Sequence, residues 1–152
     1  MTLTKAVQYL ESALRIHNMQ PEYNLAMGEC LLELGNVRDA IVHFSNVVKM
    51  RPRGIGGWEA LIRGLYKEDF LEEAMEQIAN AQTVAGDKPL FLFYKSAVLF
   101  AMSKNKEALL VLHKAMEKAP KMLKKFIELN PTILQNQQVV DVIAYYKRKR
   151  SI

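Results

Sequence analysis

The residue types that could carry out chemistry in this chain are histidine and glutamate, and their spacing does not favour catalysis. His17, His43 and His113 fall on three different expected hairpins without a shared face, so we do not expect them to act together as acid, base or metal ligand. The glutamates within 72–76 stand at the expected start of a helix, where carboxylates favour the helix dipole. Neither group has a nucleophile or a metal-ligand spacing beside it. The sequence predicts no catalytic, cofactor-binding or metal-binding residue, and we expect the protein not to be an enzyme.

Two further features bear on chemistry. Cys30 is the single cysteine, which excludes an intrachain disulfide and a cysteine-rich metal site, and we expect it to be a small buried residue. The stretch 51–57 contains three glycines flanked by two arginines and could offer backbone amides to an anion. It lacks the Lys and Ser or Thr of a nucleotide-binding loop, so we expect a flexible turn.

Length and composition indicate one soluble domain. The chain has 152 residues, 50% of them hydrophobic, which is enough to bury a core. Charged residues interrupt its apolar runs well before the roughly 20 residues that span a bilayer. The first residues alternate polar with apolar types and lack the apolar segment of a signal peptide. We therefore expect a cytoplasmic protein that does not associate with membranes.

The stretch 21–52 has the pattern of two amphipathic helices joined by a turn. Apolar or small residues recur three or four positions apart at Asn24, Met27, Gly28 and Leu31, and again at Ala40 and Phe44. Gly35 and Asn36 separate the two runs, and Pro52 ends the second because it cannot donate the next helical hydrogen bond. The stretch predicts a helical hairpin.

The hairpin pattern repeats along the chain at a fixed interval of 34 residues. The repeating columns are Ala6, Ala40, Ala74 and Ala108; Leu10, Phe44, Ile78 and Leu112; Ala13, Val47, Ala81 and Ala115; and the helix breakers Asn18, Pro52, Gly86 and Pro120. A fixed period of this length is typical of an α-solenoid.

These columns resemble the tetratricopeptide repeat (TPR) family. The first full copy matches its signature at Asn24, Met27, Gly28, Leu31, Ala40, Phe44 and Pro52, the second at Trp58, Leu61, Leu65, Ala74 and Ile78, and the third at Leu92, Ser96, Leu99, Ala108, Leu112 and Pro120. Ile62 departs from the pattern in the second copy, and Lys95 departs in the third. The resemblance covers about residues 4–120 and implies an all-α fold, a right-handed superhelix of helix-turn-helix repeats.

The predicted organisation is a single TPR domain, 1–152. An orphan second helix at 4–18 precedes full repeats at 19–52, 53–86 and 87–120. Capping helices at 121–150 close the stack: one contains Phe126 and ends at Pro131, and Asn136 caps the last.

The first helices of successive hairpins should line a concave groove, and helical spacing nominates the side chains that face it. These predicted partner-binding residues are Glu22, Leu25 and Glu29 in the first copy, Glu59, Arg63, Tyr66 and Lys67 in the second, and Phe93, Ala97 and Phe100 in the third. The third set forms an apolar row, which either the C-terminal helices or a foreign peptide could cover.

Part of the TPR family holds the C-terminal carboxylate of chaperones with Lys, Asn and Arg side chains. The matching positions of this chain are Leu25, Glu29, Ala60, Leu90 and Tyr94. None of them can pair with a carboxylate, and Glu29 would repel it, so we do not expect that class of partner.

Charge is uneven along the chain, whose formal net charge is +5, because the basic excess lies in the last third and ends in the cluster 147–150. A solvated helix end is the common meaning of such a cluster. Contact with nucleic acid or an acidic partner is the alternative, and nucleic acid is not the expected partner of the protein.

The resemblance implies a non-enzymatic scaffold for protein–protein interaction that binds a peptide segment or a partner helix in its groove. The alternative is a self-associating assembly unit, in which a second chain covers the terminal helix at 4–18 and the apolar row. A homo-oligomer is thus a second kind of expected partner.

Overall fold

The structure is a computed structural model that describes residues 2–16 and 20–150. Within these ranges the α-helices are α1 (Leu3–Ile16), α2 (Pro21–Glu33), α3 (Val37–Met50), α4 (Ile55–Lys67), α5 (Leu71–Ala85), α6 (Pro89–Ala101), α7 (Asn105–Lys118), α8 (Leu123–Leu129) and α9 (Gln137–Arg150). Two short 3-10 helices, η1 (Pro120–Met122) and η2 (Pro131–Gln135), flank α8. The described residues contain no strand, and the predicted all-α class is confirmed.

The contacts within the chain divide it into two compact units, Met1–Gly86 and Asp87–Ile152. We refer to them as the N-terminal unit, which holds α1 to α5, and the C-terminal unit, which holds α6 to α9. The boundary coincides with the predicted start of the third repeat at residue 87. That the chain forms one domain stays a prediction, and the predicted breaker Asn18 lies outside the described residues.

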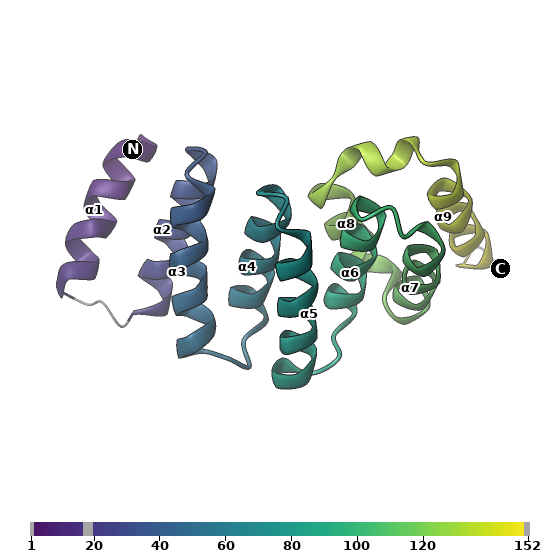
Figure 1. Ribbon diagram of the computed structural model, residues 1–152, viewed down its shortest axis with the longest axis horizontal. Helices are drawn as coiled ribbons and strands as arrows, with labels where there is room; N and C mark the ends of the chain where they lie inside the picture. The colour runs from purple at the N-terminus through teal and green to yellow at the C-terminus, as the bar shows by residue number, and fades with distance from the viewer. Residues whose placement is uncertain (1, 17–19, 151–152) are drawn as a thin grey trace. The chain divides into compact units, whose positions relative to one another are not determined.

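In the N-terminal unit, each helix packs against the next along the chain, as Figure 1 shows for α1 to α4. The α2–α3 crossing is close because Gly28 faces Phe44: a Cβ atom at residue 28 would lie 2.3 Å from Phe44 Cε1. Gly35 turns the chain between the helices with a φ of 86°, a backbone conformation that glycine adopts without steric cost. The predicted turn at Gly35 is confirmed.

The second hairpin, α4 and α5, begins where α3 ends. Trp58 is buried, and its indole Nε1 donates a hydrogen bond to the carbonyl oxygen of Pro52 at 2.6 Å. Ile62, which departs from the repeat pattern, is fully buried. The predicted flexible turn at 51–57 is wrong in part, because Gly56 and Gly57 lie inside the first turn of α4.

In the C-terminal unit, α6 packs against both α7 and α8, and α9 packs against α7 (Figure 1). Ser96 connects α6 to α7, since its buried hydroxyl donates a hydrogen bond to the carbonyl oxygen of Ala108 at 2.8 Å. Asn136 caps α9 as predicted, because its Oδ1 accepts from the backbone N–H groups of Gln138 at 3.0 Å and Val139 at 3.3 Å.

Candidate partner-binding site

The helices α2 and α4 lie side by side in the N-terminal unit and are the first helices of consecutive hairpins. Seven of the predicted partner-binding residues belong to them, and all of these except Glu22 form one set. We call this set the α2–α4 surface: Leu25 and Glu29 on α2, and Glu59, Arg63, Tyr66 and Lys67 on α4. Leu25 and Tyr66 are half-buried, and Lys67 is exposed, so both apolar and charged groups are accessible.

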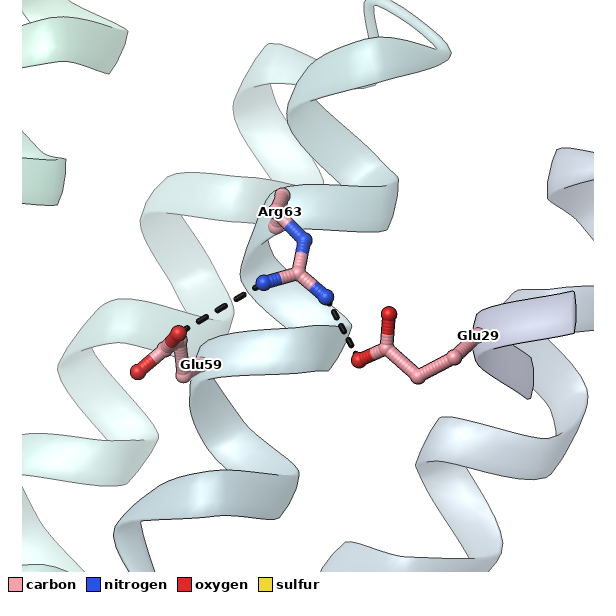
Figure 2. Close-up of polar contacts among 3 residues, drawn as sticks. All are labelled: Glu29, Glu59 and Arg63. Carbon is pink, nitrogen blue, oxygen red and sulfur yellow. Dashed lines mark hydrogen bonds and ion pairs between the residues drawn. The ribbon is translucent and has the colours of Figure 1, made fainter. Parts of the chain in front are cut away.

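Arg63 joins the two helices of this surface. Its Nη2 lies 2.6 Å from Oε1 of Glu29 on α2, and its Nη1 lies 3.5 Å from Oε1 of Glu59, one turn earlier on α4. Figure 2 shows the guanidinium between the two carboxylates. The side chain of Arg63 is 23% exposed and that of Glu59 is 18% exposed, whereas Glu29 is 45% exposed. Glu29 is therefore the member of the cluster that a partner reaches most easily.

The charge of this cluster suits recognition. Two carboxylates surround one guanidinium, which leaves a formal charge of −1 on a partly solvated surface. Ion pairs of this exposure contribute about 0–1 kcal/mol to stability, so folding alone depends little on them. The pair with Arg63 nevertheless holds the Glu29 carboxylate in position on the more exposed side of the cluster.

Glu22 does not belong to this cluster. It pairs with Arg51, whose Nη2 lies 2.6 Å from Glu22 Oε1, and both side chains are exposed. Its own backbone N–H first, and the Arg51 guanidinium second, lower the pKa of the Glu22 carboxyl. The same pair borders a cleft of about 150 Å³ that Leu25 and the glycines of α4 also line. The sequence suggested that the stretch 51–57 could bind an anion. In the structure, the guanidinium of Arg51 in this stretch already pairs with the carboxylate of Glu22.

The apolar row of the third copy lies in the C-terminal unit. Phe93 is 0% exposed, Ala97 is also buried, and Phe100 is half-buried. Phe126 of α8 covers the row, with ring centroids 6.2 Å from Phe93 and 6.4 Å from Phe100. Of the two coverings that the sequence left open, the structure has the row under the chain's own helix. A partner could reach Phe93 and Ala97 only by displacing α8.

A polar network beneath α1 was missed from the sequence. Oδ1 of the buried Asn24 lies 3.0 Å from His43 Nδ1 and accepts a hydrogen bond from Asn46 Nδ2 at 3.3 Å. Since an amide oxygen can only accept, His43 Nδ1 donates. Desolvation lowers the pKa of His43, and nearby Asp39 opposes this shift. In the sequence, Asn24 was assigned only to the repeat signature, and no signal pointed to its polar partners.

The ion pair between Glu29 and Arg63 did have a signal in the sequence. The two residues have opposite charges and are 34 residues apart, so they occupy the same repeat position on neighbouring first helices. That spacing brings the side chains together in any stack of such hairpins.

Metal ligands and membrane-spanning helices are two other features that would bear on function. In the ranges 2–16 and 20–150, no three His, Cys, Asp or Glu side chains are grouped as metal ligands would be. Cys30, predicted to be buried, is half-buried. Among these residues, no helix has the length and apolar character needed to cross a membrane.

Comparisons with known proteins identify the fold. No family model matches the sequence. The chain is 23% identical over 142 residues to anaphase-promoting complex subunit 7 of Homo sapiens and of Mus musculus; the match covers 93% of this chain and 25% of each relative. The chain thus spans about a quarter of the length of these curated relatives.

Solved structures give the same result for the fold. A crystal structure of MamA has a TM-score of 0.73 at 14% identity. The match covers 98% of this chain and 89% of the MamA chain. The structure of TTC0263, a thermophilic TPR protein of Thermus thermophilus, has a TM-score of 0.65 at 19% identity. The match covers 99% of this chain and 91% of the TTC0263 chain. Together with the helical hairpins and their 34-residue period, these likenesses show that the chain has the tetratricopeptide-repeat fold.

Proposed function

We propose that this protein is a non-enzymatic scaffold for protein–protein interaction, which binds an extended segment of a partner across the α2–α4 surface. The TPR-like fold supports a role as an interaction scaffold in general. The location is supported by one observation: Arg63 holds Glu29 and Glu59 together on neighbouring first helices, while Glu29 remains 45% exposed.

The chemistry of the surface suggests what the segment contains. A Lys or Arg of the partner would pair with Glu29, since the cluster has one carboxylate more than it has cations. Apolar partner side chains would rest on Leu25 and Tyr66, which are half-buried and provide most of the contact area. Lys67, one turn after Arg63, would favour an acidic residue further along the segment. We expect an affinity on the order of micromolar, as for other short docked peptides.

A selection from a random peptide library on the full chain tests this proposal. Peptides enriched on the wild type should contain a basic residue beside apolar ones, and Glu29→Gln should weaken their binding by about fivefold, or about 1 kcal/mol, because it removes the carboxylate that pairs with that residue. Glu76→Gln is the matched control, because Glu76 is exposed on α5, a second helix of the same unit. Circular dichroism of each variant verifies folding. Enrichment that is the same on Glu29→Gln as on the wild type would refute the proposed location.

Self-association is the second candidate, and α1 favours it. Tyr9 is 61% exposed and Ile16 is 75% exposed, so α1 presents two large apolar side chains to solvent. A cleft of about 600 Å³ also opens between α1 and the first hairpin, lined by Leu14, Met27 and His43 among others. A second copy of the chain would bury both features.

Sedimentation equilibrium over a wide concentration range distinguishes the two candidates. Self-association predicts a mass that rises with concentration and returns to that of the monomer in Ile16→Glu. Ile16 is preferable to Leu10 for this test, because Leu10 is buried and its replacement would disrupt the packing of α1. A constant monomer mass would eliminate the second candidate and leave the peptide scaffold untouched.

A further inference from the structure

The C-terminal unit is strongly basic. Asp87–Ile152 contains 13 Lys and Arg against 5 Asp and Glu, a formal net charge of +8, whereas Met1–Gly86 contains 8 against 11, or −3. Four of the cations are consecutive, 147–150, in the last turn of α9. This asymmetry gives the C-terminal unit a long-range attraction for anionic partners.

Helix stability does not account for the whole of this cluster. Cations in a last turn interact favourably with the helix dipole, at about 0.3–1 kcal/mol each, but neighbouring like charges repel one another. Within the part of the chain that the structure describes, Arg148, Lys149 and Arg150 form no ion pair, and all three are exposed. An anionic partner would relieve this repulsion.

A cleft lies against the cluster. It has a volume of about 510 Å³ and is lined by the apolar groups of Met116, Pro120 and Tyr146, with Lys149 and Arg150 at its edge. The ammonium of Lys149 is 6.0 Å from the centroid of the Tyr146 ring. The cleft therefore combines an apolar floor with a cationic border.

The floor of this cleft is held in position by α7. The Tyr146 hydroxyl donates to the carbonyl oxygen of His113 at 3.1 Å, and Oε1 of Glu117 lies 3.4 Å from the same hydroxyl. The ring of Tyr146 also packs against that of His113, with centroids 5.6 Å apart. Because these contacts fix the Tyr146 side chain, a ligand would meet a cleft whose floor is preformed.

We propose that the cleft between α7 and α9 and the basic cluster 147–150 together bind an acidic segment of a partner protein that contains apolar side chains. Carboxylates of the segment pair with Arg148, Lys149 and Arg150, and an apolar side chain enters the cleft. This site is on the C-terminal unit and prefers the opposite charge to the α2–α4 surface, so it does not depend on the function proposed above.

The cleft suits a polypeptide better than a nucleic acid. Tyr146 is 5% exposed, so its ring face cannot stack on a base. The carboxylate of Glu117 lines the same cleft and can accept a hydrogen bond from a peptide N–H, a donor that a phosphodiester backbone lacks.

Fluorescence anisotropy with a labelled peptide of four Asp-Leu-Glu repeats tests the proposal on the full chain. The triple variant Arg148→Gln, Lys149→Gln, Arg150→Gln should weaken binding by about tenfold or more, since each exposed pair contributes roughly a two- to fivefold effect. The matched control removes three exposed cations of the same unit elsewhere, Lys88→Gln, Lys104→Gln and Lys106→Gln, and should change binding by less than about twofold.

A second variant tests the cleft itself. Glu117→Gln removes the only carboxylate among the described residues that line it, and should strengthen binding of the acidic peptide by about twofold. Glu107→Gln is its control, because Glu107 lies ten residues earlier on α7, about 15 Å away along the helix.

Four results would overturn the proposal. The first is that the acidic peptide does not bind at about 0.01 M ionic strength, and the second is that the two triple variants lose binding equally. The third is that a single-stranded RNA binds more tightly than the peptide. The fourth is that a second copy of the chain competes with the peptide and abolishes its binding. Selective loss in the Arg148–Arg150 variant, with weaker binding at about 0.15 M ionic strength, would support it.

Discussion

The two units carry different surfaces at equivalent repeat positions. Glu29, Arg63 and Ala97 are 34 residues apart, and so are Leu25, Glu59 and Phe93. In the N-terminal unit these positions hold the charged cluster around Arg63, which is partly exposed. In the C-terminal unit they hold buried apolar residues beneath α8. The repeat thus determines which way a side chain points, and the next element along the chain determines whether it stays accessible.

The largest effect should come from removing the cover of the apolar row. Phe126→Ala deletes a fully buried ring that packs against Phe93 and Phe100, and should lower the free energy of unfolding of the C-terminal unit by about 3–5 kcal/mol. Urea denaturation followed by circular dichroism, together with binding of a hydrophobic dye, measures the effect.

Phe70→Ala provides the control for this comparison. Phe70 is half-buried in the N-terminal unit, where its ring lies 5.5 Å from the guanidinium of Arg38, and its loss should cost only about 1–2 kcal/mol. Equal losses in the two variants, or no added dye binding by Phe126→Ala, would mean that α8 is not an essential cover.

A smaller effect should distinguish the two hairpin crossings. Gly28 and Ser96 occupy the same repeat position, but a Cβ at Gly28 would lie 2.3 Å from Phe44 Cε1. We expect Gly28→Ala to destabilise the N-terminal unit by about 1–3 kcal/mol through overpacking. Ser96→Ala adds no atom and loses one hydrogen bond, at about 0.5–1.5 kcal/mol. Thermal unfolding of both variants measures the difference, and a neutral Gly28→Ala would contradict the close crossing.

Stability should also depend on pH through His43 in the N-terminal unit. Because desolvation lowers the folded-state pKa of His43, the unfolded chain binds a proton more readily once the pH falls below about 6.5. Its contribution is therefore complete above about pH 6.5 and decreases as the pH falls toward the lowered pKa.

Urea denaturation at several pH values between about 8 and 5 measures this dependence. One group contributes a slope of at most about 1.4 kcal/mol per pH unit, and His43→Gln should remove that contribution. The groups that face the same cleft, Glu11 and Arg15, are retained in both proteins. The same slope in His43→Gln as in the wild type would assign the pH dependence to other residues.

The smallest effect should be that of the Glu29–Arg63 pair on stability. A double-mutant cycle with Glu29→Gln and Arg63→Met should give a coupling of about 0.2–1 kcal/mol, because both side chains are partly solvated. Chemical denaturation measures the cycle. A coupling well above this range would mean that the cluster serves folding more than recognition.

Much of the fold could be predicted because its determinants are local. The 34-residue period, the turn at Gly35 and the cap at Asn136 each depend on a few neighbouring residues, and the structure confirms them. The helical start of α4 was missed, because glycines at 56 and 57 lower helix propensity and only packing in the folded chain offsets that cost.

The candidate site was only partly predictable for a different reason. Periodicity identified Glu29, Glu59 and Arg63 as residues of the first helices, but it could not decide whether Phe93 and Ala97 are covered. That outcome depends on where α8 packs, which is a non-local property of the chain. The pair between Glu22 and Arg51 was missed because it joins a first helix to the end of the second helix in the same hairpin.

The most direct test of the central claim is hydrogen–deuterium exchange of the full chain with and without the tightest peptide from the library selection. We predict slower exchange in α2 and α4 around Glu29 and Arg63, and no change in α6 or α8. Protection of α6 around Phe93, with faster exchange in α8, would contradict the account, because the partner would then displace α8 to occupy the apolar row.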